Sequence, residues 1–232
     1  MTGTGESMAY KNNDVRIEQL SFIGKVLSVF THELNNHLAI IKESAGLIED
    51  TLRFQKSSGK YDIEEGLKVI QSIENQIGKT AWICKKLNGF GHRMDRALST
   101  FSVNESIEEL LVLLNRVANQ KKVSFEKDFQ EDIPPVCSDP AGLQLIVFCS
   151  IDRLLKSLDK DSSLIFKTKY SGDSIRISII PKGDFIESGE REICPEDISQ
   201  YVIEQLDGSI IKNAEDKGIT ITLPVKTVAG ST

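Results

Sequence analysis

His32 and its neighbours are the side chains of this sequence whose types and spacing could carry out a reaction. The segment from Phe30 to Asn36 reads FTHELNN. An imidazole in solvent can attack a phosphoryl group with one nitrogen if a neighbour accepts the proton from the other nitrogen or fixes its tautomer. Glu33 is adjacent and could do this, and Asn36 lies one helical turn after His32, where it could orient water or a phosphoryl oxygen. Three polar residues without a chemical role, on a solvated helix face, would give the same pattern. The group alone therefore does not distinguish a reactive site from an ordinary polar surface.

A seam of apolar residues predicts the helix that carries this group. From Asp14 to about Gln55 there is no proline, and apolar residues recur in steps of three and four at Leu20, Ile23, Leu27, Phe30, Leu34, Ile41, Ile48 and Leu52. His32 lies on the outermost face relative to this seam, so we expect it to be exposed. His37 falls in the seam itself, so we expect it to be packed rather than reactive. At about 1.5 Å per residue, the helix would be a rod of roughly 60 Å.

A second helix is predicted from about Asp62 to Asn88, after the break at 57–60, and Gly89 and Gly91 mark its expected end. Two long helices joined by a short loop must lie antiparallel. A single pair leaves one apolar side in water, so we expect two chains to pair as a homodimer with a four-helix bundle.

The second half of the chain has a different pattern, with short helices and strands. We predict helices at 104–115, with Asn104 as its cap, at 139–158 and at 195–206, and strands at 122–129, 164–170, 174–180, 209–212 and 219–224. The segment 171–173, Ser-Gly-Asp, has the composition of a hairpin turn. This order predicts an α+β fold, in which a helical hairpin precedes an α/β sandwich with helices on one face of a sheet.

Composition excludes several classes of protein. The net charge of -6 argues against a nucleic-acid binder, because duplex binding needs a concentrated basic face. The four cysteines are far apart and form no CxxC pair, so we expect reduced thiols and no metal site. No apolar run approaches the roughly 20 residues that span a bilayer, and the first residues do not resemble a signal peptide. We therefore expect a cytoplasmic chain without a membrane span.

The stretch FTHELNNHLAII, from Phe30 to Ile41, resembles the H-box of HisKA-type sensor histidine kinases, whose usual form is close to HELNNPLAII. The one departure is His37, where the family has proline. In that family the histidine is phosphorylated, the following acid acts as a base and the polar residue three positions after the acid supports phosphatase activity. The resemblance implies these roles for His32, Glu33 and Asn36. It also implies that a response regulator docks below the histidine, on Val29, Phe30 and part of the second helix.

Further stretches resemble the ATP-binding domain of the same family. They are Phe101–Asn104, Ile133–Pro140, Tyr201–Ile210 and Gly218–Pro224, so the resemblance covers about residues 15 to 225. It implies a flexible tail at 1–13, a dimerisation and histidine-phosphotransfer hairpin at 14–97, an ATPase-like domain at 98–226 and a second tail at 227–232.

The nucleotide site that this resemblance implies is degenerate. Asp152 occupies the position of the asparagine that holds Mg²⁺ in the family. Pro181 replaces the aspartate that reads adenine, and Phe185 replaces a glycine of the same turn, although Gly183 remains. Between Ile186 and Ile198 there is no GxG, and the acids Glu187, Glu190, Glu192, Glu196 and Asp197 would repel a triphosphate. We therefore predict no useful ATP binding and no bound cofactor.

Three functions fit these features. In the first, His32 accepts a phosphoryl group from a response-regulator aspartate and passes it on, as in dimeric histidine phosphotransferases, with Mg²⁺ bound to the regulator; phosphatase activity through Glu33 and Asn36 is a variant. In the second, the chain is a non-catalytic pseudokinase that binds a regulator or a partner kinase. In the third, it is an active kinase with a divergent ATP site. The intact His-Glu-x-x-Asn group favours the first function, because a pure scaffold does not need it.

Overall fold

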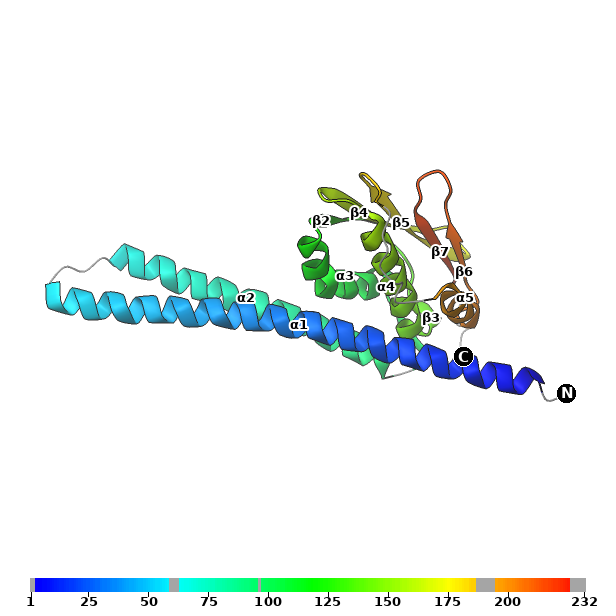
Figure 1. Ribbon diagram of the computed structural model, residues 1–232, viewed down its shortest axis with the longest axis horizontal. Helices are drawn as coiled ribbons and strands as arrows, with labels where there is room; N and C mark the ends of the chain where they lie inside the picture. The colour runs from blue at the N-terminus through cyan, green and yellow to red at the C-terminus, as the bar shows by residue number, and fades with distance from the viewer. Residues whose placement is uncertain (1–2, 59–62, 96, 187–194, 226–232) are drawn as a thin grey trace.

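A computed structural model of the chain describes residues 3–58, 63–95, 97–186 and 195–225. Two long helices, α1 (Gly3–Ser58) and α2 (Ile63–Met94), lie antiparallel and form a rod. The second domain packs on the side of the rod, at the end away from the α1–α2 connection (Figure 1). The helical hairpin followed by an α+β domain is the predicted fold class.

Helix α1 begins at Gly3, so residues 3–13, which the sequence assigned to a tail, continue the helix that carries His32. The segment up to Asn13 contains no proline. Once a helix is nucleated, each added residue contributes one more backbone hydrogen bond, so propagation needs no strong local preference. The polar composition of this segment was therefore a poor guide to its backbone.

Helix α2 ends at Met94 rather than before Gly89. A Cβ atom at Gly89 would lie 2.5 Å from Oε1 of Glu109, a residue of the next helix. The glycine therefore permits a close approach between α2 and the second domain and does not end the helix, although its residue type had predicted a helix end. Helix α2 also shows the expected charge bias, with Glu64 and Glu65 in its first turn and Arg93 in its last.

The second domain contains a five-stranded sheet in the order β2-β4-β5-β7-β6. Its strands are β2 (Val123–Phe129), β4 (Ser162–Tyr170), β5 (Ser174–Lys182), β6 (Ser209–Lys212) and β7 (Ile219–Pro224). Strands β2 and β4 are parallel, and the other neighbouring pairs are antiparallel. The helices α3 (Val103–Gln120), α4 (Pro140–Ser157) and α5 (Glu196–Gln205) lie between the sheet and the rod (Figure 1).

The five predicted strands are present, and β4 and β5 form the predicted hairpin, in which Gly172 has a φ of +90°. Two strands were missed: β1 (Ser99–Phe101) and β3 (Val136–Ser138) pair as a separate antiparallel sheet. Three residues are too few to display an alternating pattern. The cap of α3 also differs from the prediction, because Ser102 accepts the hydrogen bond from the Glu105 N–H.

The hairpin and the second domain share one hydrophobic core. Phe22 and Val26 of α1 are fully buried, although α1 is otherwise largely exposed. The ring of Phe22 lies 4.6 Å from that of Phe148 on α4 and 5.4 Å from that of Phe90 on α2, measured between centroids. Two buried aromatic contacts of this kind fix the second domain against the rod.

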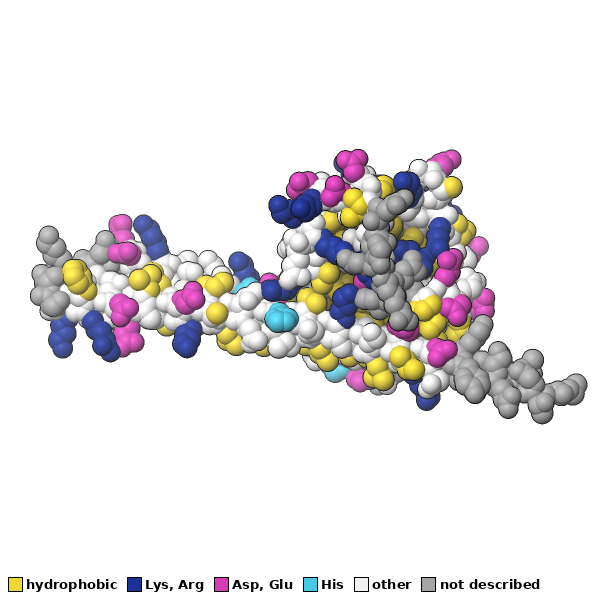
Figure 2. All heavy atoms as spheres, in the orientation of Figure 1, with side chains coloured by type: hydrophobic (Ala, Val, Ile, Leu, Met, Phe, Trp, Pro, Cys, Tyr) yellow, Lys and Arg dark blue, Asp and Glu magenta, His cyan; other side chains and the backbone are white. Residues whose placement is uncertain are grey.

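The rest of the hairpin exposes its apolar seam. Hydrophobic side chains are visible at intervals along the rod (Figure 2). Trp82 of α2 is exposed beside the second domain. The large exposed side chains along the rest of the two helices are Ile17, Leu20, Leu27, Leu38, Ile40, Leu47, Leu52, Phe54, Ile63, Leu67, Ile70 and Ile77. Such a stripe is expected of a helix pair that buries this side against a further partner. None of the helices in the described ranges is long and apolar enough to cross a lipid bilayer.

Candidate functional site

His32 lies midway along α1, and its side chain is exposed, as its position relative to the seam predicts. Asn36, one turn further along, is exposed as well. Their shared helix face is therefore open to a macromolecular partner. Val29 and Phe30 are partly buried, and Phe30 also packs against the core, so these two residues offer only part of their surface for docking.

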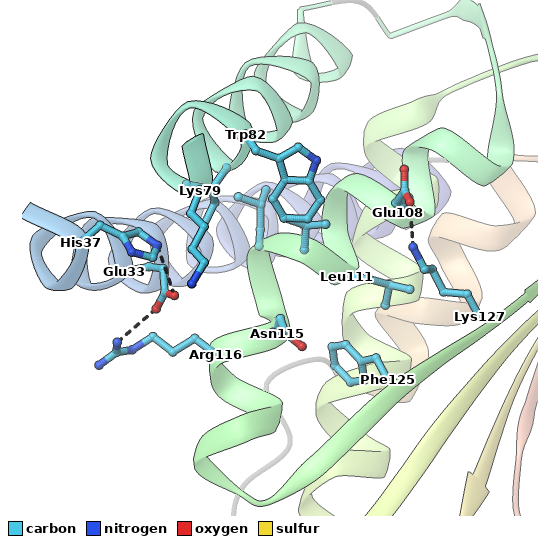
Figure 3. Close-up of a pocket in the computed structure, with 13 residues that line it drawn as sticks. Glu33, His37, Lys79, Trp82, Glu108, Leu111, Asn115, Arg116, Phe125 and Lys127 are labelled. Atoms are coloured by element: carbon cyan, nitrogen blue, oxygen red, sulfur yellow. Dashed lines mark hydrogen bonds and ion pairs between the residues drawn. The ribbon is translucent and has the colours of Figure 1, made fainter. Parts of the chain in front are cut away.

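Glu33 interacts with the second domain and not with His32. Its Oε2 accepts a hydrogen bond of 3.2 Å from Nη1 of Arg116 on α3, and its side chain is 31% exposed (Figure 3). Consecutive helical residues point in different directions, because each residue turns the helix by about 100°. In the described ranges, no hydrogen bond joins Glu33 to His32. In this structure the Glu33 carboxylate therefore contacts Arg116, and its role as a base for His32 stays a prediction.

His37 connects Glu33 to the second helix of the hairpin. Its Nδ1 lies 2.7 Å from Oε1 of Gln76 on α2, and its Nε2 lies 3.6 Å from Oε1 of Glu33. The side chain is only 12% exposed, so the expectation of a packed histidine is confirmed. When Nδ1 donates to the Gln76 oxygen, Nε2 can donate to Glu33 only if the ring is doubly protonated.

No pattern in the sequence indicated Gln76 or Arg116 as site residues. Together with His37 and Glu33 they form a polar chain that runs from α2 through α1 to α3. Arg116 lies 83 positions after Glu33, just beyond the predicted end of its helix. No spacing rule within one helix could have connected these residues.

The carboxylate of Asp152 on α4, which the resemblance aligns with the Mg²⁺-binding asparagine of the family, contacts two lysine ammonium groups. One oxygen lies 3.1 Å from Nζ of Lys25 on α1, and the other lies 2.6 Å from Nζ of Lys156. The carboxylate is 9% exposed. A divalent ion would have to displace both ammonium groups from this carboxylate.

The turn to which the resemblance assigns adenine recognition begins at the end of strand β5. Pro181 is buried on β5, where it pairs with Leu164, and it has neither a backbone donor nor a polar side chain. Gly183 has a φ of +133°, and a Cβ there would meet Oγ of Ser162 at 2.2 Å. The ring of Phe185 lies 4.1 Å from Nζ of Lys217. These contacts supply packing, and none of these three residues carries a carboxylate.

The acidic segment that was expected to repel a triphosphate is described only at its end. Glu187, Glu190 and Glu192 lie outside the described residues. Glu196 contacts Nζ of Lys212 at 2.6 Å, and this contact lowers the pKa of the Glu196 carboxyl. In the ranges that the structure describes, no group of three or more His, Cys, Asp or Glu side chains is arranged to hold a metal ion.

The chain is similar in sequence to two curated histidine kinases, while no protein-family model matches it. It is 24% identical over 167 residues to the signal transduction histidine-protein kinase AtoS of Escherichia coli (strain K12), and this alignment covers 72% of this chain and 26% of AtoS. It is 20% identical over 185 residues to the adaptive-response sensory kinase SasA of Microcystis aeruginosa (strain NIES-843 / IAM M-2473), and this alignment covers 76% of this chain and 47% of SasA. The chain thus spans between about a quarter and about half of the length of these relatives.

Solved structures of histidine kinases also align with the chain at low identity. The histidine kinase AdeS of Acinetobacter baumannii aligns with 16% identity and a TM-score of 0.47, covering 80% of this chain and 97% of that one. The histidine kinase ThkA, solved in complex with the response regulator protein TrrA, aligns with 18% identity and a TM-score of 0.48, covering 97% and 68%. It is the similarity in sequence to two histidine kinases, over about three quarters of the chain, that supports the predicted resemblance to a histidine-kinase core.

Proposed function

We propose that this chain is a phosphorelay protein of two-component signalling, in which His32 accepts a phosphoryl group from a response-regulator aspartate and passes it on. One observation carries the proposal: His32 and Asn36 are exposed on one face of α1, within a segment that resembles the H-box. An exposed imidazole at the middle of a rigid rod is accessible to a globular receiver domain. The sequence similarity to histidine kinases supports the two-component setting.

The transfer itself needs positioning more than acid–base chemistry. An imidazole nitrogen of His32 attacks the phosphorus of the aspartyl phosphate, the new N–P bond forms, and the aspartate leaves as a carboxylate. The proton on the other ring nitrogen can remain there or pass to solvent. The reverse sequence delivers the group to a second aspartate. Because transfer in either direction is nearly isoenergetic, the main requirement is alignment of the two reactants. Mg²⁺ would be bound by the regulator.

The proposal includes the absence of ATP binding. The support is that Lys25 and Lys156 hold Asp152, and that buried Pro181 stands where a carboxylate is needed. Calorimetry with Mg-ATP tests this part: we expect no heat of binding, and a micromolar dissociation constant would overturn it.

The proposal also includes a homodimer. The exposed seam of α1 and α2 would be buried if two hairpins formed a four-helix bundle. Light scattering on the eluting protein should give about twice the chain mass of 25.8 kDa. A monomer at micromolar concentration would refute this arrangement.

The test of phosphoryl transfer uses a panel of purified receiver domains carrying labelled phosphoaspartate. We expect an acid-labile, base-stable label on the chain with at least one of them, and we expect His32→Ala to abolish the label. His92→Ala is the matched control, because His92 is also exposed and lies at the end of α2. Labelling that survives in His32→Ala, or that no receiver domain produces, would refute the assigned role.

The structure also gives a reason to consider a non-catalytic regulator-binding protein. Glu33 is engaged by Arg116, so the acid beside the histidine is not free in this arrangement. For such a protein we expect receiver domains to bind the chain and its His32→Ala variant with equal affinity, without transferring the label.

A further inference from the structure

A cavity of about 460 Å³ lies where the hairpin meets the second domain. It is bordered by α1, α2, α3 and β2, and the side chains around it converge from all four elements (Figure 3). Its size lies in the range of sites for small molecules, which occur preferentially at domain interfaces. Its lining includes neither His32 nor the residues at the predicted nucleotide site.

The wall of the cavity is mostly apolar and includes two aromatic rings. Trp82 of α2 is 52% exposed although it borders the cavity, and Phe125 of β2 is partly buried. Leu111 and Val112 of α3 also line the cavity. An exposed indole ring next to an apolar wall offers a surface on which a flat apolar group can stack.

The charged groups at the end near β2 satisfy one another. Glu108 accepts hydrogen bonds of 2.8 Å from Lys127 and 2.7 Å from Lys86. These two ammonium groups lower the pKa of the Glu108 carboxyl to about 2, so the acid is ionised. Both ammonium groups at this end therefore already have an anionic partner.

The end near α1 has an excess of positive charge. Glu33 pairs with Arg116, whereas Lys79 has no hydrogen-bond or ion-pair partner among the residues that the structure describes. Figure 3 shows the Lys79 amine directed toward the Glu33–Arg116 pair. An acid group placed here could contact both cations, at a short distance from the indole ring.

We infer that this cavity binds a small organic anion with a flat apolar body, whose acid group pairs with Lys79 and Arg116 and whose body stacks on Trp82. Binding has a consequence that rests on the proposed function: the ligand and Glu33 compete for Arg116, so the ligand releases the acid beside the phosphorylated histidine. The site would thereby couple a small molecule to the lifetime of the phosphoryl group.

Trp82 allows a direct test because it is the only tryptophan of the chain. The probe is 1-anilinonaphthalene-8-sulfonate, a flat aromatic sulfonate that accepts energy from an excited indole. We expect energy transfer from Trp82 to the bound dye at a stoichiometry of one per chain. N-phenyl-1-naphthylamine, the same ring system without the sulfonate, should bind more weakly. Equal affinity for the two dyes would overturn the assignment of an anion site.

Variants separate the cavity from the exposed apolar seam. Replacing both cations (Lys79→Gln with Arg116→Gln) should weaken sulfonate binding by about tenfold or more and leave the neutral dye unaffected, because charged hydrogen bonds are lost. Val112→Phe, which fills the cavity, should remove energy transfer for both dyes. Lys85→Gln, on an exposed position of α2, is the control and should change neither. Unchanged sulfonate binding in the double variant and in Val112→Phe would show that the dye lies on the seam, and would refute the site.

The coupling to phosphoryl chemistry is tested in a second step, on chains labelled at His32 by a receiver domain. We expect the sulfonate dye to shorten the lifetime of the label in the native chain and not in Arg116→Gln. If the dye binds as expected but the lifetime does not change, the site stands and the coupling is wrong. If no receiver domain labels the chain, the proposed function fails while the dye measurements still decide the site.

Discussion

Arg116 of α3 donates a hydrogen bond of 3.2 Å to the carboxylate of Glu33 on α1, so the second domain holds the acid that follows His32. The same carboxylate lies 3.6 Å from His37, which contacts Gln76 on α2. Three helices are therefore connected through one acid. A shift of the second domain against the rod would change which groups Glu33 can reach.

Replacing Arg116 with alanine should release Glu33. In the proposed function, the free carboxylate can orient or deprotonate a water molecule, and general-base assistance of this kind contributes about 10²-fold or more when it is well placed. We expect the label on His32 to be lost faster in Arg116→Ala, by roughly tenfold because a released side chain is not well placed. The measurement is the half-life of label on the isolated phosphorylated chain.

Two further variants control this experiment. Arg116→Lys keeps a cation near Glu33 and should retain most of the native half-life. The double variant with Glu33→Gln should return to the slow rate, because no carboxylate remains. A fast rate that persists without the Glu33 carboxylate would show that Arg116 acts through the packing of α3.

Asp152→Asn restores the residue type that holds Mg²⁺ in the kinase family, yet it should not restore ATP binding. Pro181 still lacks the carboxylate that reads adenine, and Phe22 of α1 still packs on α4. Losing the charge leaves the Lys25 and Lys156 ammonium groups without an anion. We expect the free energy of unfolding to fall by about 1–2 kcal/mol, because Lys25 is partly exposed and its share is screened by solvent.

Calorimetry with Mg-ATP and urea denaturation of the same preparations measure both effects. Asp161→Asn, in the turn between α4 and β4, is a control for the loss of one carboxylate. Nucleotide binding by Asp152→Asn at micromolar concentration would contradict the account of the site.

Short-range sequence patterns predicted the helix that carries His32 and the start of α4. The seam from Leu20 to Leu52 predicted a helix and placed His32 outside, because one helical period relates all of these residues. Asp139 and Pro140 marked the start of α4, where Asp139 accepts the Ala141 N–H. Each of these signals lies within a few positions of the feature that it predicts.

The contacts at the site could not be predicted in this way. Lys25 and Asp152 are 127 positions apart, and Glu33 and Arg116 are 83 apart. Their pairing follows from the placement of the second domain on the rod, which the buried rings of Phe22 and Phe148 determine. Gly89 illustrates the same point, since its role is set by Glu109, which no local rule connects to it.

Glu108 should make stability depend on pH in the acid range. Its folded-state pKa of about 2 is below the ordinary value of 4.5, so the folded protein binds this proton less readily than the unfolded chain. The ionised Glu108 carboxylate therefore stabilises the folded protein fully above pH 4.5, and this contribution is lost as the pH falls toward 2. We expect Glu108→Gln to unfold more readily than the native chain near neutral pH and to lose less stability between pH 5 and pH 3.

Urea denaturation at several pH values measures this difference between the native chain and the variant. Glu126→Gln, on an exposed position of β2, serves as the control and should show the same pH dependence as the native chain. Parallel curves for the native chain and Glu108→Gln would mean that Lys86 and Lys127 do not favour the ionised acid.

Gly89 and Gly91 lie two positions apart in α2 and should respond in opposite ways to alanine. A methyl group at Gly91 meets no atom within 4 Å, so Gly91→Ala should stabilise the chain by about 0.5–1 kcal/mol through helix propensity. A methyl group at Gly89 would lie 2.5 Å from Oε1 of Glu109. That carboxylate is held by Arg93 through bonds of 2.6 and 3.0 Å, so moving it weakens a bidentate pair at the junction of the two domains. We expect Gly89→Ala to lower the free energy of unfolding by about 1–2 kcal/mol despite the same gain in helix propensity.

Thermal denaturation of Gly89→Ala and Gly91→Ala side by side measures the contrast. A stabilised Gly89→Ala would show that α2 and α3 do not approach as closely as this packing requires.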